Sequence, residues 1–106
     1  MANSYKNIKT DYTATTLTTL LTVDTGSTCI IKSMLVSEDA GSTPTITISL
    51  VNGSDTFNLF KDKPFTAKQT IELLSQPLVL QGGEILKAQA SAGDQLHSII
   101  SYLEVS

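Results

Sequence analysis

The chain has 106 residues, enough for one domain and too few for two domains with separate cores. Only 16% of the residues are charged, and the formal net charge is −3. All seven basic residues are lysines, and the chain has no arginine. Duplex DNA binding generally requires a basic face and arginine side chains that read guanine edges, so we expect no nucleic-acid partner.

Hydroxyl side chains take the place of the missing charges. The chain contains fifteen Thr and twelve Ser. Thr is β-branched and suits the half-exposed surface of a strand. A hydroxyl-rich surface with few charges is only weakly hydrated. We therefore expect much of this surface to contact other protein molecules.

The N-terminal residues 1–11 are polar, and we expect them to form a flexible arm before a β-sandwich domain of residues 12–106. Such an arm would become ordered on a neighbouring subunit. The segment carries Lys6, Lys9 and Asp11 and lacks an apolar core, so it does not resemble a signal peptide. No apolar run approaches the ~20 residues of a membrane span. We therefore expect synthesis in the cytoplasm and no membrane partner.

Regularly spaced turn signals divide the rest of the chain into short segments rich in Thr, Ile, Val and Leu. This spacing predicts an all-β fold, an antiparallel β-sandwich of about eight short strands that is either jelly-roll-like or immunoglobulin-like. The expected turns are residues 24–27, 38–42, 52–55, 62–64, 75–77, 81–84 and 91–94.

The first expected strand after the threonine-rich start is Thr28–Val36, which carries apolar residues on both faces. Pro44–Val51 follows and alternates between Ile or Leu and hydroxyl residues, as a half-buried strand does. Asn52-Gly53 then supplies the positive φ angles of a tight hairpin turn into Thr56–Phe60.

In the second half, Ala67–Leu74 is expected as a strand, because Pro77 would stop a helix after two turns. Ile85–Ala90 alternates with one face inward. Leu96–Val105, like the first strand, is apolar on both faces. Strands of this kind lie centrally in a sandwich or contribute their second face to a subunit interface.

No residue pattern predicts a catalytic, cofactor-binding or metal-binding site. Cys29 is the only cysteine, so we expect it to be a small buried hydrophobic residue without a disulfide or metal. Any Ser-His-Asp triad would have to use His97, the only histidine, which we expect on the solvent face of its strand. Lys61 and Lys63 are expected in a solvated loop.

One short segment does resemble a catalytic motif. Residues 21–28, LTVDTGST, are similar to the active-site segment of pepsin-like and retroviral aspartic proteases. That resemblance implies a homodimer in which each subunit contributes Asp24 to a carboxylate pair. The family also has a glycine-rich flap and a second apolar-apolar-Gly segment followed by a helix. The hairpin at residues 52–55 and the segment VLQGG at 79–83 fit these features poorly. We predict that Asp24 belongs to a structural turn, with the protease dimer as an alternative.

A longer resemblance covers the second half of the chain. Residues 77–92, PLVLQGGEILKAQASA, and 96–105, LHSIISYLEV, resemble a group of small virion structural proteins of tailed bacteriophages. The first half agrees more loosely. The resemblance implies a β-sandwich module on a capsid, neck, tail or fibre, and it implies no catalytic residues.

The combined expectation is a non-enzymatic virion structural protein, made in the bacterial host cytoplasm and located in the virion. The first choice is a capsid decoration (cement) protein that binds the major capsid protein as a homo-oligomer, with a trimer favoured. A neck, tail or fibre-attachment component is the alternative. A carbohydrate-binding module ranks last, because the chain has three Tyr, three Phe and no Trp. With few charges to protect sheet edges, we also expect those edges to be occupied by a partner.

Overall fold

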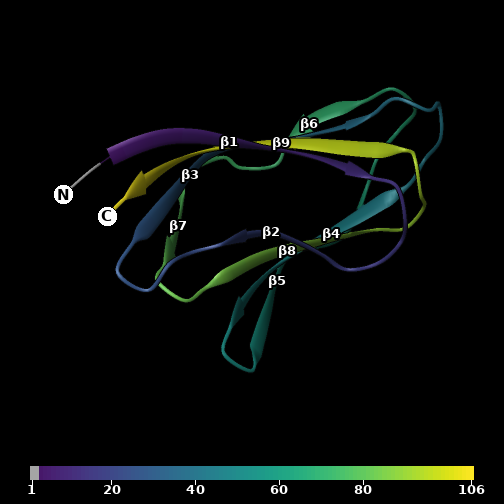
Figure 1. Ribbon diagram of the computed structural model, residues 1–106. Coiled ribbons are helices and arrows are strands. Elements are labelled where there is room, and N and C mark those ends of the chain that lie inside the picture. The colour runs from purple at the N-terminus through teal and green to yellow at the C-terminus, as the bar shows by residue number, and fades with distance from the viewer. Residues whose placement is uncertain (1–2) are drawn as a thin grey trace.

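The fold is described from a computed structural model, for residues 3–106. These residues form nine strands and no helix, so the expected all-β sandwich of about eight short strands is confirmed (Figure 1). The strands are β1 (Asn3–Tyr12), β2 (Thr18–Thr22), β3 (Thr28–Glu38), β4 (Thr45–Asn52), β5 (Asp55–Pro64), β6 (Thr70–Glu72), β7 (Leu78–Gln81), β8 (Ile85–Ala90) and β9 (Leu96–Val105).

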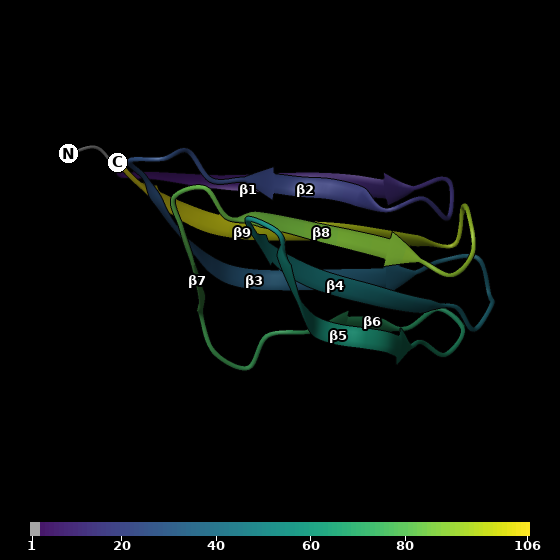
Figure 2. The same ribbon diagram turned by 90° about the horizontal axis from the view of Figure 1, so that it is seen from below.

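The strands form two antiparallel sheets that pack face to face (Figures 1 and 2). The five-stranded sheet has the order β1-β9-β3, with both β6 and β7 paired to the remaining edge of β3. The four-stranded sheet has the order β2-β8-β4-β5. Most connections cross from one sheet to the other, while the β4–β5 hairpin and the β6–β7 connection each stay within one sheet. This is the strand order of a jelly roll in which the strand beside β3 is divided into β6 and β7. The order decides between the two expected kinds of sandwich.

The core lies between the two sheets and is formed by the inward residues of nearly every strand. In β8 the expected alternation holds, since every second side chain is buried. In β4 it holds from Thr45 to Ile48, after which Ser49 is buried and Leu50 is half-buried, where the register with β5 shifts. Burial of these side chains is the main favourable term in folding. The buried hydrophobic residues of the four central strands are Cys29, Ile31, Met34, Val36, Ile46, Ile48, Leu86, Ala88, Ala90, Leu96, Ile100 and Tyr102.

A bulge in β3 explains why the sequence of this strand is apolar on both faces. The register between β3 and β9 shifts at Lys32, which is an extra residue on β3. Before the bulge, Cys29 and Ile31 are fully buried. After it, the inward positions are Met34 and Val36. The extra residue reverses the alternation, so an uninterrupted period of two cannot be read from the sequence.

The expected flexible arm is instead a strand over the part of it that the structure describes. Residues 3–12 form β1 and pair with β9 at every position, from Asn3 opposite Val105 to Tyr12 opposite Leu96. Residues 1 and 2 lie outside the described residues. Tyr12 anchors the strand because its ring is buried and its hydroxyl lies 2.9 Å from the hydroxyl oxygen of Ser98. The polarity of residues 3–11 reflects an edge strand, most of whose side chains are exposed.

Two expected turns differ in detail. Of the Asn52-Gly53 pair, only Gly53 has a positive φ, of 64°. Asn52 pairs with Asp55 across the hairpin, so the turn residues are Gly53 and Ser54, with glycine first as in a type II′ turn.

The expected turn at residues 62–64 lies inside β5. Asp62, with a φ of 51°, sits where the register between β4 and β5 shifts. Its backbone N–H donates to the Thr47 hydroxyl at 3.0 Å. The segment is a β-bulge, which bends a strand without ending it.

A buried carboxylate ties two loops together at one end of the sandwich. Glu38 ends β3 and is only 2% exposed. Its carboxylate accepts the backbone N–H groups of Lys68 at 2.8 Å, Ser42 at 2.9 Å, Gly41 at 3.0 Å and Ala40 at 3.1 Å. The bond from Lys68, with those from the other three, holds the pKa of the Glu38 carboxyl below its ordinary value of 4.5, although burial acts in the opposite direction.

Replacing Glu38 by Gln should lower the melting temperature at neutral pH, because an amide accepts these four N–H groups less well than a carboxylate. A carboxyl whose pKa is lowered by folding stabilises the protein above pH 4.5 and loses this effect as the pH falls through its folded pKa. The difference between wild type and Glu38→Gln should therefore shrink below pH 4.5. Thermal melts from pH 3 to pH 7 would measure it. Asp55→Asn, at an exposed turn, is the matched control, and an equal loss there would contradict this role of Glu38.

Candidate interaction face

Asp24 occupies an exposed turn between β2 and β3. Its backbone carbonyl accepts the N–H groups of Gly26 at 3.1 Å and Ser27 at 3.0 Å, which closes the turn. A Cβ added to Gly82 would lie 2.9 Å from that same carbonyl oxygen, so the turn packs directly against the backbone of the β7–β8 turn. The backbone of the Asp-Thr-Gly-Ser segment therefore forms a turn that packs on the β7–β8 turn.

His97 lies on the outward side of β9, as expected. Its Nδ1 is 3.5 Å from the Asp39 carboxylate, and its side chain is 35% exposed. Ser37 is its cross-strand neighbour on β3, but the Ser37 hydroxyl lies 2.9 Å from the Thr70 hydroxyl oxygen. His97 and Asp39 are thus close, while the cross-strand serine, Ser37, is hydrogen-bonded to Thr70.

The described residues contain no group of three or more His, Cys, Asp or Glu side chains placed to hold a metal ion. Cys29 is a free, fully buried cysteine on β3, and burial raises the pKa of its thiol. Within residues 3–106, no helix is long and apolar enough to cross a membrane.

Exposed apolar side chains gather on one surface of the molecule. Six large hydrophobic side chains are exposed within residues 3–106, and four of them lie on the solvent side of the five-stranded sheet. We call this surface the outer face. The four are Tyr5 at 80%, Val79 at 51%, and Leu35 and Ile99 at 39% each.

The first row of the outer face crosses four strands. Tyr5 of β1 pairs with Leu103 of β9, Leu103 with Ile30 of β3, and Ile30 with Val79 of β7. Paired residues of antiparallel strands point to the same side of the sheet, so the four side chains form one apolar stripe. The stripe combines two exposed and two half-buried residues.

The second row has an apolar centre and charged ends. Lys9 of β1 pairs with Ile99 of β9, Ile99 with Leu35 of β3, and Leu35 with Glu72 of β6. The sequence pattern predicted that the strands now labelled β3 and β9 are apolar on both faces. It did not show that their outward residues align, because alignment depends on the register between the paired strands.

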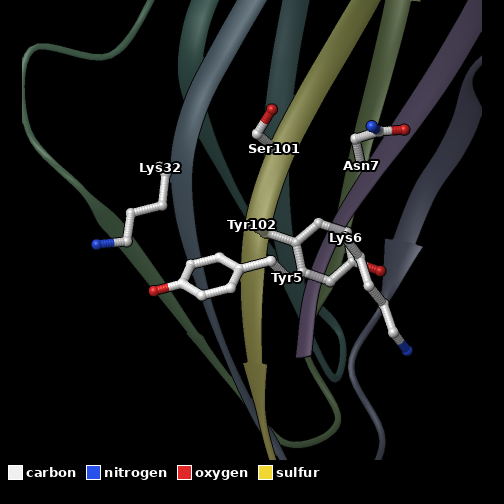
Figure 3. Close-up of a pocket in the computed structure, with 6 residues that line it drawn as sticks. All are labelled: Tyr5, Lys6, Asn7, Lys32, Ser101 and Tyr102. Atoms are coloured by element: carbon white, nitrogen blue, oxygen red, sulfur yellow. The ribbon is translucent and has the colours of Figure 1, made fainter. Parts of the chain in front are cut away.

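A shallow hollow of about 480 Å³ separates the two rows (Figure 3). The Tyr5 ring extends across β9 toward Lys32, the bulge residue of β3. Lys6 points away from that ring and forms an ion pair with Glu104 at 2.8 Å. The hollow is lined by Tyr5, Lys6, Asn7, Lys32, Ser101 and Tyr102. It therefore offers an aromatic surface, hydrogen-bond donors and positive charge to another protein.

The sheet edges are less open to pairing than the low charge content predicts. Four of the seven lysines lie on the edge strands β1 and β5, and β5 also ends in Pro64 and contains a bulge. Lysine, proline and bulges all oppose edge-to-edge pairing. The four are Lys6, Lys9, Lys61 and Lys63.

No protein-family model and no curated protein matches the chain. Among solved structures, the chain is similar to two crystal structures of a pentameric capsid protein isolated from metagenomic phage sequences. Both are 17% identical at a TM-score of 0.49, with 93% of this chain covered. The chain spans only 59% and 60% of the length of those capsid chains. It is also similar to the Eiger TNF of S. frugiperda, 16% identical at a TM-score of 0.42, with 96% of this chain and 85% of that one covered.

Asp24→Asn should leave every activity of the protein unchanged, because the turn is closed by the backbone of residue 24. The purified protein is incubated with unfolded casein and with phage precursor proteins between pH 4 and pH 7. We expect no cleavage. Cleavage that pepstatin blocks and Asp24→Asn abolishes would establish the protease alternative.

Stability should depend on neither a metal nor a disulfide. The single buried Cys29 has no cysteine partner in its own chain, and the described residues hold no cluster of metal ligands. Melting curves in chelator and in reductant should superpose on the untreated curve. A fall of roughly ten degrees in chelator, which exceeds ~1 kcal/mol for a domain of this size, would reveal an ion site.

Proposed function

We propose that this protein is a non-enzymatic virion structural protein of a tailed phage. Among the virion roles we favour that of a capsid decoration protein, which stabilises the major capsid shell. The observation that carries the proposal is the outer face: a jelly roll presents four exposed apolar side chains on one sheet. Exposed apolar side chains that gather on one face of a protein mark protein–protein contact sites. The function is therefore binding and assembly.

The assignment to a virion is supported by the sequence resemblance of residues 77–105 to small tailed-phage structural proteins. The jelly roll is an architecture found in viral capsid domains and in lectins. A fold does not determine a function by itself, so the resemblance and the outer face carry the assignment together. The hydroxyl-rich, weakly charged surface agrees with a protein whose surface is largely in contact with other proteins.

A neck, tail or fibre-attachment role is the second candidate. The protruding β4–β5 hairpin favours it, because this hairpin carries Phe57 with its side chain 55% exposed, away from the outer face (Figure 1). An exposed aromatic residue on a projecting hairpin is a suitable anchor in a pocket of another virion protein.

A decoration protein should make the shell more resistant to heat and to low salt. Capsid shells are prepared with and without the protein, and their disassembly is followed by light scattering. We expect shells that carry the protein to disassemble at higher temperature. Equal resistance of the two preparations would reject the cement role and leave the neck, tail or fibre role.

We also propose that the protein is a closed cyclic homo-oligomer, with three subunits as the favoured number. Repeated contacts around a symmetry axis let many modest contacts hold a ring on a shell. Light scattering on the isolated protein should then give about three times the monomer mass of 11.3 kDa.

A further inference from the structure

We propose that the outer face is the contact surface between copies of this chain. The copies surround an axis parallel to the strands, so that the β1 edge of one copy meets the β6–β7 edge of the next. This inference rests on the proposed homo-oligomer and adds the surface, the orientation and the contacting residues.

The outer face carries four of the six large hydrophobic side chains that are exposed within residues 3–106. Its two rows place Tyr5, Val79, Ile99 and Leu35 in water, with Leu103 and Ile30 half-buried between them. The edge strands, in contrast, carry lysines and a bulge that oppose pairing. Association through the face removes apolar surface from water and leaves the lysine-bearing edges without an added strand.

The ends of each row identify the partner as another copy. The first row begins with the large ring of Tyr5 on β1 and ends with the small side chain of Val79 on β7. The second begins with the cation of Lys9 on β1 and ends with the carboxylate of Glu72 on β6. When the β1 edge of one copy lies beside the β6–β7 edge of the next, the large Tyr5 ring meets the small Val79 side chain. The Lys9 cation likewise meets the Glu72 carboxylate.

The same orientation avoids repulsion between like charges. Asp11, the other charged outward residue of β1, lies one row beyond Lys9 in register with His97, Ser37 and then Thr70 of β6. It would therefore face the neutral Thr70 of the next copy. If two β1 edges met instead, Lys9 would lie against Lys9, which is unfavourable.

Glu72 is available for this contact in its charged form. Burial raises the pKa of its carboxyl, but hydrogen bonds from Ser33, Met34 and Leu74 outweigh burial and hold the pKa below 4.5. An ionised carboxylate has about four acceptor sites, so it can accept a lysine of the next copy beside its present donors.

The first test measures self-association of the full chain by sedimentation equilibrium. Tyr5→Ser, Val79→Ser and Lys9→Glu should each weaken association by at least about tenfold, as central interface substitutions do. The matched controls carry equivalent changes away from the outer face: Phe57→Ser, Leu17→Ser and Lys61→Glu, the first two at side chains 55% and 53% exposed. Circular dichroism confirms that each variant is folded. A wild-type monomer at the highest soluble concentration, or equal weakening by the controls, would overturn the proposal.

The second test maps the orientation. A zero-length carbodiimide joins lysines to carboxylates in contact, and mixed isotope-labelled and unlabelled protein distinguishes links between copies from links within one. Lys9 and Glu72 lie three strand spacings apart in one chain, about 14 Å, so a link between them must join two copies. We expect a Lys9–Glu72 link between copies. The Lys6–Glu104 pair, 2.8 Å apart in one chain, is the internal positive control. Oligomers that yield the control link but no Lys9–Glu72 link would overturn the orientation.

Binding of the same variants to capsid shells separates this inference from the proposed function. Wild-type oligomers that use the outer face but do not bind shells would refute the decoration role and support the interface. Shell binding by a protein that is monomeric and insensitive to the outer-face variants would support the role and refute the interface.

Discussion

The pairing of β3 with β9 is the interaction on which the rest of the structure depends. The two strands lie side by side at the centre of the five-stranded sheet, and every other strand of that sheet pairs with one of them. Their inward residues, including Ile31 and Ile100, are fully buried against the second sheet. Because antiparallel pairing assigns each residue to one side, this one register determines both the core and the outer face.

The outer face follows from that register. Once Ile31 and Ile100 point inward, their neighbours Ile30 and Ile99 must point outward. A monomer gains little from apolar residues at those outward positions, since they remain partly in water. Their presence on both central strands supports the proposed contact with another protein, which links the geometry of the sheet to the proposed assembly role.

The structural role of a short sequence segment depends on the groups that it contacts in the folded protein. The segment at Asp24 resembles a protease motif in isolation, yet its backbone closes a turn that packs on Gly82. Glu38, which forms no recognisable motif, holds two loops through four backbone N–H groups. This buried carboxylate is fully hydrogen-bonded, and it joins two loops that no disulfide joins.

The sequence by itself determined the all-β class, the sites of most strands, the two central strands and the buried state of Cys29. These features depend on alternation and turn chemistry, which act over a few residues. Only the tertiary structure decided that residues 3–12 pair with β9, that Lys32 is a bulge, that Glu38 accepts four backbone N–H groups, and that Tyr5 and Val79 share one row. The strand pairs join residues that are up to about a hundred positions apart in the sequence. Three donors to Glu38 are local, but the fourth, Lys68, is 30 residues away. The strand pairing is set by the joint packing of all the strands, so no short stretch of sequence contains it.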